Sequence, residues 1–192
     1  NATDCPESFV FGGHTNVVNK TAGGSYNRNS ILGGNSNNIT MTSDTMNDCL
    51  ILGGVSNTIS TPGDLVSDII IGGHLNSITY ANESCIMGGD SNGIHHGVDN
   101  FIIGGESNSV INSIGTSNSL IKSGIVGGYN NTIDNLNLNL DQCVIIGGVG
   151  NTIEGASYAS GIINGDGSII TSSVRSTCIG RDNNCTNTGM FM

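Results

Sequence analysis

Apolar and polar positions along this chain recur in one short pattern. Two large apolar residues precede a Gly-Gly pair, and two spacers, an asparagine, one further residue and another apolar side chain follow it, as in the segment from Ile102 to Val110. Such copies at a roughly constant period are typical of a solenoid in which each copy forms one coil. With the first glycine, or its equivalent, as the marker, the copies are placed by Gly12, Gly33, Gly53, Gly72, Gly88, Gly104, Gly127, Gly147, Asn164 and Gly180.

The residues before the marker indicate strands rather than helices. The apolar column two positions before it is dominated by isoleucine, which suits a strand. Glycine, at 30 of 192 residues, would destabilise helices throughout the chain. The sequence therefore predicts an all-β, single-chain β-solenoid, or β-roll, of about ten short coils. We expect residues 1–192 to form one repeat domain, with residues 1–8 and 186–192 as candidate caps.

The glycines and the asparagine of each copy have structural explanations. Paired glycines accept positive φ and let successive coils approach closely at a corner. Stacked asparagines form an amide ladder that can satisfy backbone groups at that corner. The predicted ladder consists of Asn16, Asn37, Asn57, Asn76, Asn92, Asn108, Asn131, Asn151 and Asn184, with Ser168 as the one exception.

A second apolar column lies directly beside the first. Neighbouring side chains of a strand point to opposite faces, so one column fills the coil interior and the other faces outward. A continuous outward apolar stripe marks an interface in a soluble protein, and identical stripes can bury one another around a rotation axis. The predicted interface column is Phe11, Leu32, Leu52, Ile71, Met87, Ile103, Val126, Ile146, Ile163 and Ile179.

Composition narrows the classes of partner. The net charge of −10, with five Lys and Arg, argues against nucleic acid and anionic membrane surfaces. No apolar run approaches the length of a membrane span. Because the chain begins at Asn1 without a methionine, we expect a processed product or a fragment.

The sequence contains six cysteines, and their positions predict different roles for them. Cys49, Cys85 and Cys143 precede apolar pairs of non-neighbouring coils, so we interpret them as buried small side chains. Cys178 and Cys185 share the last coil and are candidates for a disulfide.

One group of side chains invites a search for chemistry. His74, Asp90 and Glu106 follow the Gly-Gly pair in three consecutive coils, so stacking would place them in one row that could bind a cation. The same column holds His14 and Tyr129, as a tolerant solvent-facing position would. We therefore interpret the row as surface, and we expect no metal, no cofactor and no enzyme activity.

The unit from Asp99 to Val110 resembles the head repeat of trimeric autotransporter adhesins, in which a polar pair precedes an apolar-Ile-Gly turn. Its doubled glycine and its Asn-x-apolar ending are similar to the Ile-Gly-Gly repeats of giant-virus fibre proteins and phage tail fibres. The resemblance implies a left-handed β-roll, a parallel homotrimer, and display on a virion or cell surface.

The leading hypothesis is thus a non-catalytic surface fibre, decoration or attachment protein. Its partners would be copies of itself and a host receptor or glycan, met by variable arms such as Thr40–Asp48, Ser60–Asp68 and Ser113–Ser123. Two alternatives stay open. An ice-binding solenoid would array threonine on a flat face, and a carbohydrate-cleaving spike would use Asp90 and Glu106 as its carboxylate pair.

Overall fold

The computed structural model of the chain describes residues 2–3, 7–20, 28–42, 48–61, 67–112, 122–135 and 142–186. Within these ranges the chain forms strands, turns and bends, with no helix. Strands alternate along the sequence between an eleven-stranded and a ten-stranded sheet, and their pairings are parallel. The prediction of an all-β solenoid is confirmed.

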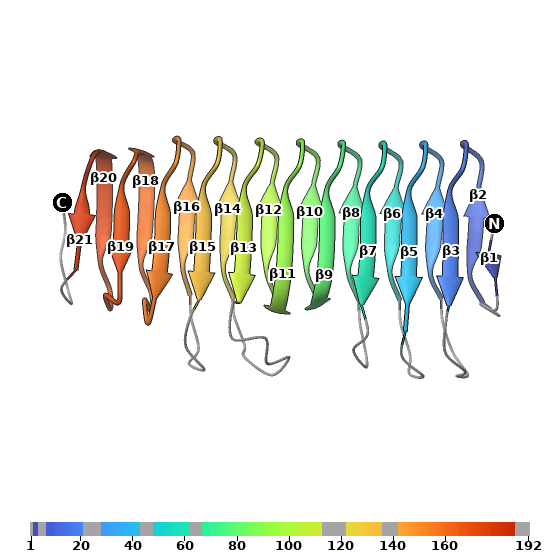
Figure 1. Cartoon of the computed structure of the whole chain (residues 1–192), viewed down its shortest axis with the longest axis horizontal. Helices are drawn as coiled ribbons and strands as arrows, with labels where there is room; N and C mark the ends of the chain where they lie inside the picture. The colour runs from blue at the N-terminus through green and yellow to red at the C-terminus, as the bar shows by residue number, and fades with distance from the viewer. Residues whose placement is uncertain are drawn as a thin grey trace.

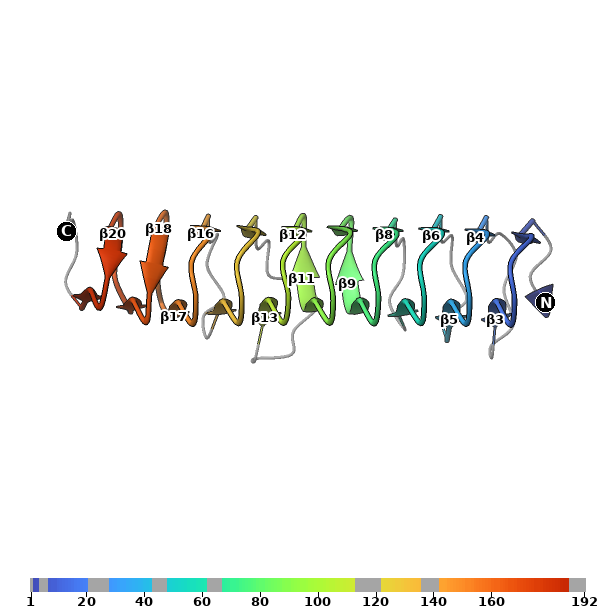
Figure 2. The same cartoon turned by 90° about the horizontal axis from the view of Figure 1, so that it is seen from above.

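The chain advances along a rod. Figure 1 shows β1 (Ala2–Thr3) and β21 (Asn184–Cys185) at opposite ends, with the strands of the two sheets alternating between them. Figure 2 shows the same rod from above, where the two sheets form two facing layers. Each circuit of the chain therefore adds one strand to each layer.

The strands are short. The ten-stranded sheet contains β2 (Phe9–Phe11), β4 (Ser30–Leu32), β6 (Leu50–Leu52), β8 (Ile69–Ile71), β10 (Cys85–Met87), β12 (Phe101–Ile103), β14 (Gly124–Val126), β16 (Val144–Ile146), β18 (Gly161–Asp166) and β20 (Thr177–Arg181). The eleven-stranded sheet contains β1 (Ala2–Thr3), β3 (Val17–Lys20), β5 (Asn38–Met41), β7 (Thr58–Thr61), β9 (Ser77–Asn82), β11 (Gly93–Val98), β13 (Ser109–Asn112), β15 (Thr132–Asn135), β17 (Thr152–Gly155), β19 (Ile169–Thr171) and β21 (Asn184–Cys185).

The two ends of the rod bear on the predicted caps. At the N-terminal end, β1 pairs with β3 and is the edge strand of the eleven-stranded sheet. Of the predicted C-terminal cap, only Thr186 is described, and residues 187–192 lie outside the described residues.

The core is a double column of aliphatic side chains between the sheets. In β12, for example, Ile102 is fully buried between two less buried neighbours, and it lies in register with Ile86 of β10. Val110 of β13 fills the facing column. Burying one such side chain contributes about 1.5–3 kcal/mol, so the repeated isoleucines hold the two sheets together along the rod. The inward column before the marker is Val10, Ile31, Ile51, Ile70, Ile86, Ile102, Ile125, Ile145, Ile162 and Cys178.

The Gly-Gly pairs turn the chain at one edge of the rod, the upper edge in Figure 1. Gly104 and Gly105 have φ angles of +64° and +81°, values that side-chain-bearing residues rarely adopt. The two glycines differ in their surroundings. A Cβ atom on Gly104 would meet nothing, whereas one on Gly105 would overlap the Asn108 side chain and the carbonyl oxygen of Gly128 in the next coil.

The asparagine ladder follows these glycines. Asn108 Oδ1 accepts the backbone N–H of Asn131 at 3.0 Å, and its Nδ2 donates to the carbonyl of Gly128 at 3.1 Å. The Oδ1 bond to the next asparagine repeats along the rod. Each Oδ1 thus satisfies a backbone N–H that the tight corner would otherwise leave buried and unpaired, and each Nδ2 gives a second bond to a carbonyl such as that of Gly128, which also accepts the Glu106 N–H.

The last position of the predicted ladder is wrong by one residue. Ser168 takes the place of an asparagine, as predicted, and its Oγ accepts the N–H of Asn183 at 3.3 Å. Asn184 lies one residue further along, exposed in β21 and opposite Ile169. The reason is a shorter corner, because the register between β18 and β20 shifts after Ile163 and brings Arg181 opposite Asp166.

A second ladder, not predicted from the sequence, lines the opposite corner of the core. We call it the corner ladder, and its members lie four residues before each marker. The side-chain oxygens of its asparagine, aspartate and most of its serine members accept a backbone N–H of the next coil, as Asn100 Oδ1 does from Ser123 at 3.1 Å. It consists of Ser8, Asn29, Cys49, Asp68, Ser84, Asn100, Ser123, Cys143, Ser160 and Ser176.

Candidate functional site: an uncharged outer face

The predicted interface column lies on the outer face of the ten-stranded sheet. Ile103 is 39% exposed although it stands beside the fully buried Ile102, and Phe11 at the end of the rod is 73% exposed. Alternation along a strand explains this difference between neighbours. The other members of the column are also exposed or half-buried.

A second outward row was missed by the sequence analysis. In each three-residue strand the central residue points inward, so the first residue shares the outer face with the third. The repeat pattern of two adjacent apolar residues does not include this row. Alternation was nevertheless a signal for it, because the residues on both sides of each buried isoleucine must face outward. The row is Phe9, Ser30, Leu50, Ile69, Cys85, Phe101, Gly124, Val144, Gly161 and Thr177.

The two rows together form what we call the outer apolar face. None of its twenty positions, all within the described ranges, carries a charged side chain. The outer face of the eleven-stranded sheet is different, since Asp134 and Glu154 are neighbours there. One face of the rod therefore lacks the charges that water-facing β-sheets ordinarily display.

Phe101 shows how the outer apolar face is packed. Its ring lies over Gly124 of the neighbouring strand, where any side chain would clash with it. Gly124 is buried as a result. The glycine at this position is therefore explained by side-chain packing, because its φ lies outside the positive range.

The predicted row of His74, Asp90 and Glu106 is brought together by stacking, since the three residues form successive parallel bridges. His74 Nδ1 lies 3.2 Å from the Asp90 carboxylate, and Ser91 Oγ donates to the same carboxylate at 2.7 Å. The serine hydroxyl, followed by His74, lowers the pKa of Asp90. Among the described residues, no three His, Cys, Asp or Glu side chains are arranged to hold a metal ion.

The column that bears on ice binding lies on the outer face of the eleven-stranded sheet. It follows the asparagine ladder and is chemically mixed: Val17, Asn38, Thr58, Ser77, Gly93, Ser109, Thr132, Thr152 and Ile169. Some of its hydroxyls are engaged locally, as Ser77 Oγ is with Thr79 Oγ1 at 3.1 Å.

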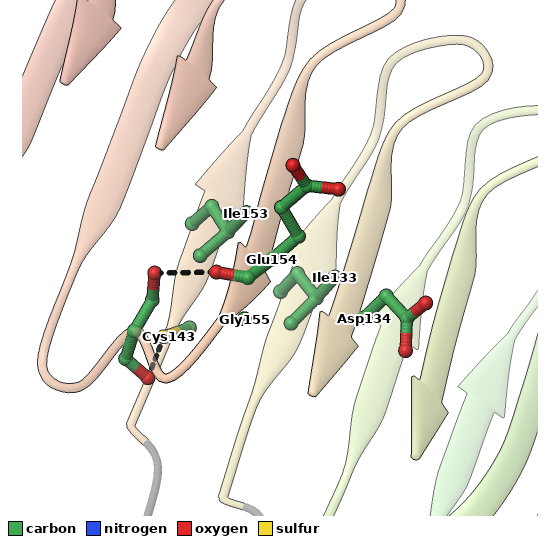
Figure 3. A pocket seen from close by; sticks show the side chains of 7 residues that line it. Ile133, Asp134, Cys143, Ile153, Glu154 and Gly155 are labelled. Atoms are coloured by element: carbon green, nitrogen blue, oxygen red, sulfur yellow. Dashed lines mark hydrogen bonds between the residues drawn. The ribbon is translucent and has the colours of Figure 1, made fainter. Parts of the chain in front are cut away.

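A small hollow opens at the corner-ladder edge, between β15 and β17 (Figure 3). Cys143 and the ends of the two strands line it, and Ser157 Oγ donates to the Glu154 carbonyl at 2.8 Å. Its volume of about 10 Å³ is close to the minimum that one water molecule needs. The hollow is too small for an organic substrate.

The five cysteines in the described ranges occupy three kinds of position, and Cys5 lies outside those ranges. Cys178 and Cys185 are fully buried in the last coil and are paired as a disulfide. Cys49 and Cys143 are buried in the corner ladder, as the sequence predicted. The interpretation of Cys85 as buried is wrong, because it lies one residue closer to the marker and is half-buried on the outer apolar face.

No protein-family description, curated protein or solved structure matches the chain. In the described part of the chain, no helix is long and apolar enough to cross a membrane.

Proposed function

We propose that this chain is a non-catalytic structural rod of a virion or cell surface. It acts as a fibre, decoration or attachment protein, and it assembles as a parallel homotrimer through the outer apolar face. The observation that carries the proposal is that face itself, with two outward rows free of charge along the ten-stranded sheet.

The dimensions of the face favour copies of the chain as its cover. Ten strands at the usual spacing extend over roughly 43 Å, so the apolar rows run the length of the sheet. An isolated monomer rarely leaves so continuous a patch in water. Identical rods around an axis parallel to their length would cover it along its full extent. The number three rests on the resemblance to trimeric fibre heads.

Such an assembly would suit a mechanical task. Parallel backbone ladders run the length of both sheets, and a shared apolar axis would add a second set of contacts between chains. The eleven-stranded sheet would then face outward and carry recognition. Antibodies raised against this sheet should label the surface of intact particles or cells if the rod is displayed there, and their failure to label would contradict surface display.

An aspartate on the outer apolar face should separate the chains. Ile103→Asp would bury a carboxylate in the interface, whereas Ser109→Asp places the same charge in the same coil on the opposite sheet. Because an unpaired buried charge is strongly unfavourable, we expect sedimentation velocity to find monomers for Ile103→Asp and assembled parent-like species for Ser109→Asp. Equal behaviour of the two variants would contradict the assigned interface.

A further inference from the structure

Asp68 stands out in the corner ladder because all other members of that ladder are amides, hydroxyls or thiols. The residue is fully buried. Its Oδ1 accepts the Ser84 N–H at 2.9 Å, but Oδ2 is buried and has no hydrogen-bond partner in the part of the chain that the structure describes. An ionised carboxylate in this position would lose its hydration, and the single hydrogen bond from Ser84 would compensate for only a small part of that loss.

Among the described residues, the groups around Asp68 offer no positive charge. On one side lies the thiol of Cys49, whose sulfur accepts the Asp68 N–H, with Asp48 beyond it. On the other side lie Glu83 and the thiol of Cys85. The nearby guanidinium of Arg28 is bound to Asp48, and Asp68 takes part in none of the ion pairs between described residues.

Burial is the largest influence on this carboxyl. It raises the pKa of Asp68 from 3.8 to about 7, with the charge of Glu83 acting in the same direction and the Ser84 N–H opposing it. Asn29 and Asn100 occupy the equivalent corner in other coils, where the Oδ1 of an uncharged amide accepts the ladder N–H. Their Nδ2 atoms, like Asp68 Oδ2, are buried without a hydrogen-bond partner among the described residues, so the corner tolerates an unpaired atom where the side chain is neutral. The carboxyl therefore fits this site best when it is protonated.

We propose that Asp68 is a pH-sensitive lock in the rod. Its neutral carboxyl keeps the coils containing β6, β8 and β10 closed in acid, and its ionisation loosens their corner as the pH rises.

The direction of the pH effect follows from proton linkage. A group whose pKa is raised by folding binds more protons in the closed state, so closure is strongest below the ordinary carboxyl pKa. The fraction of open corners should rise about tenfold per pH unit above about pH 4. The rise should end near pH 7, where the closed state also becomes ionised. The corner at Asp68 is therefore most stably closed in acid, and its open fraction is largest above neutrality.

Two buried thiols provide a reporter and its control. Opening the corner at Asp68 exposes Cys49, because the Cys49 sulfur accepts the backbone N–H of Asp68. Cys143 occupies the same ladder and is also buried, but its ladder neighbours are Ser123 and Ser160. The ratio of the two reactivities cancels the ordinary increase of thiolate with pH.

The test is labelling of the full chain with a pyridyl disulfide between pH 5 and pH 8, with peptide mass spectrometry to distinguish Cys49, Cys143 and Cys85. We expect the Cys49-to-Cys143 rate ratio to rise about tenfold per pH unit up to pH 7 and then to level off. In Asp68→Asn, which the natural amides of the ladder show to be compatible with the fold, the ratio should stay constant. A constant ratio in the parent, or an unchanged rise in Asp68→Asn, would overturn the lock.

Discussion

Alanine at Gly105 is expected to disrupt the rod, whereas alanine at Gly104, the adjacent residue, should be tolerated. Both glycines have positive φ, so each substitution carries a backbone cost of about 1–2 kcal/mol. At Gly104 this backbone cost is the whole effect, since an added Cβ would have no atom within 4 Å. At Gly105 the Cβ would also overlap Asn108 and the backbone of the next coil.

Because backbone cannot move aside without separating the coils, Gly105→Ala should lose about 4 kcal/mol or more. Denaturant unfolding followed by circular dichroism measures both variants. Similar losses for the two would mean that the corner is held together by something other than the close approach of successive coils.

The second large effect is expected at the asparagine ladder. Asn108→Leu would leave the N–H of Asn131 buried without its partner. The carbonyl of Gly128 would lose the amide bond but keep the one that it accepts from the Glu106 N–H. Leaving one such buried N–H unsatisfied costs roughly 1–3 kcal/mol. The leucine side chain would fill the space, so the loss would report on hydrogen bonding rather than on a cavity.

Serine is the matched control, because the chain already uses one in this ladder. Ser168 Oγ donates to the Gly180 carbonyl at 2.9 Å and accepts the Asn183 N–H. Asn108→Ser should therefore cost about 1 kcal/mol. Hydrogen exchange at the Asn131 amide should accelerate strongly in the leucine variant and weakly in the serine variant. If the leucine variant were as stable as the parent, the amide ladder would have no energetic importance.

Much of the fold could be predicted because every coil repeats the same local physics. Ile102 and Ile103 are adjacent and both apolar, yet alternation alone requires that one be buried and one exposed. The ladder from Asn16 to Asn151 followed from the fixed distance between the Gly-Gly corner and the asparagine. That distance failed at Asn184, where the final corner is one residue shorter.

Two features of the candidate site could not be read from the same pattern. The outward row containing Phe101 also contains Ser30, Gly124 and Thr177, so it lacks a uniform apolar signature. The corner ladder mixes asparagine, serine, cysteine and aspartate, which share small size rather than one chemistry. Both sets of residues lie at a fixed distance before the marker glycine of their own coil. Their distance from the preceding coil varies, because arms of different length lie between, and this variation obscures both sets in the sequence.

The burial of the outer apolar face between chains is the central claim, and the solution mass of the parent protein tests it most directly. Multi-angle light scattering at micromolar concentration should give a mass near three times the 19.6 kDa of one chain. A mass of one chain, unchanged on raising the concentration, would contradict the account and leave the uncharged face of the ten-stranded sheet in need of a different partner.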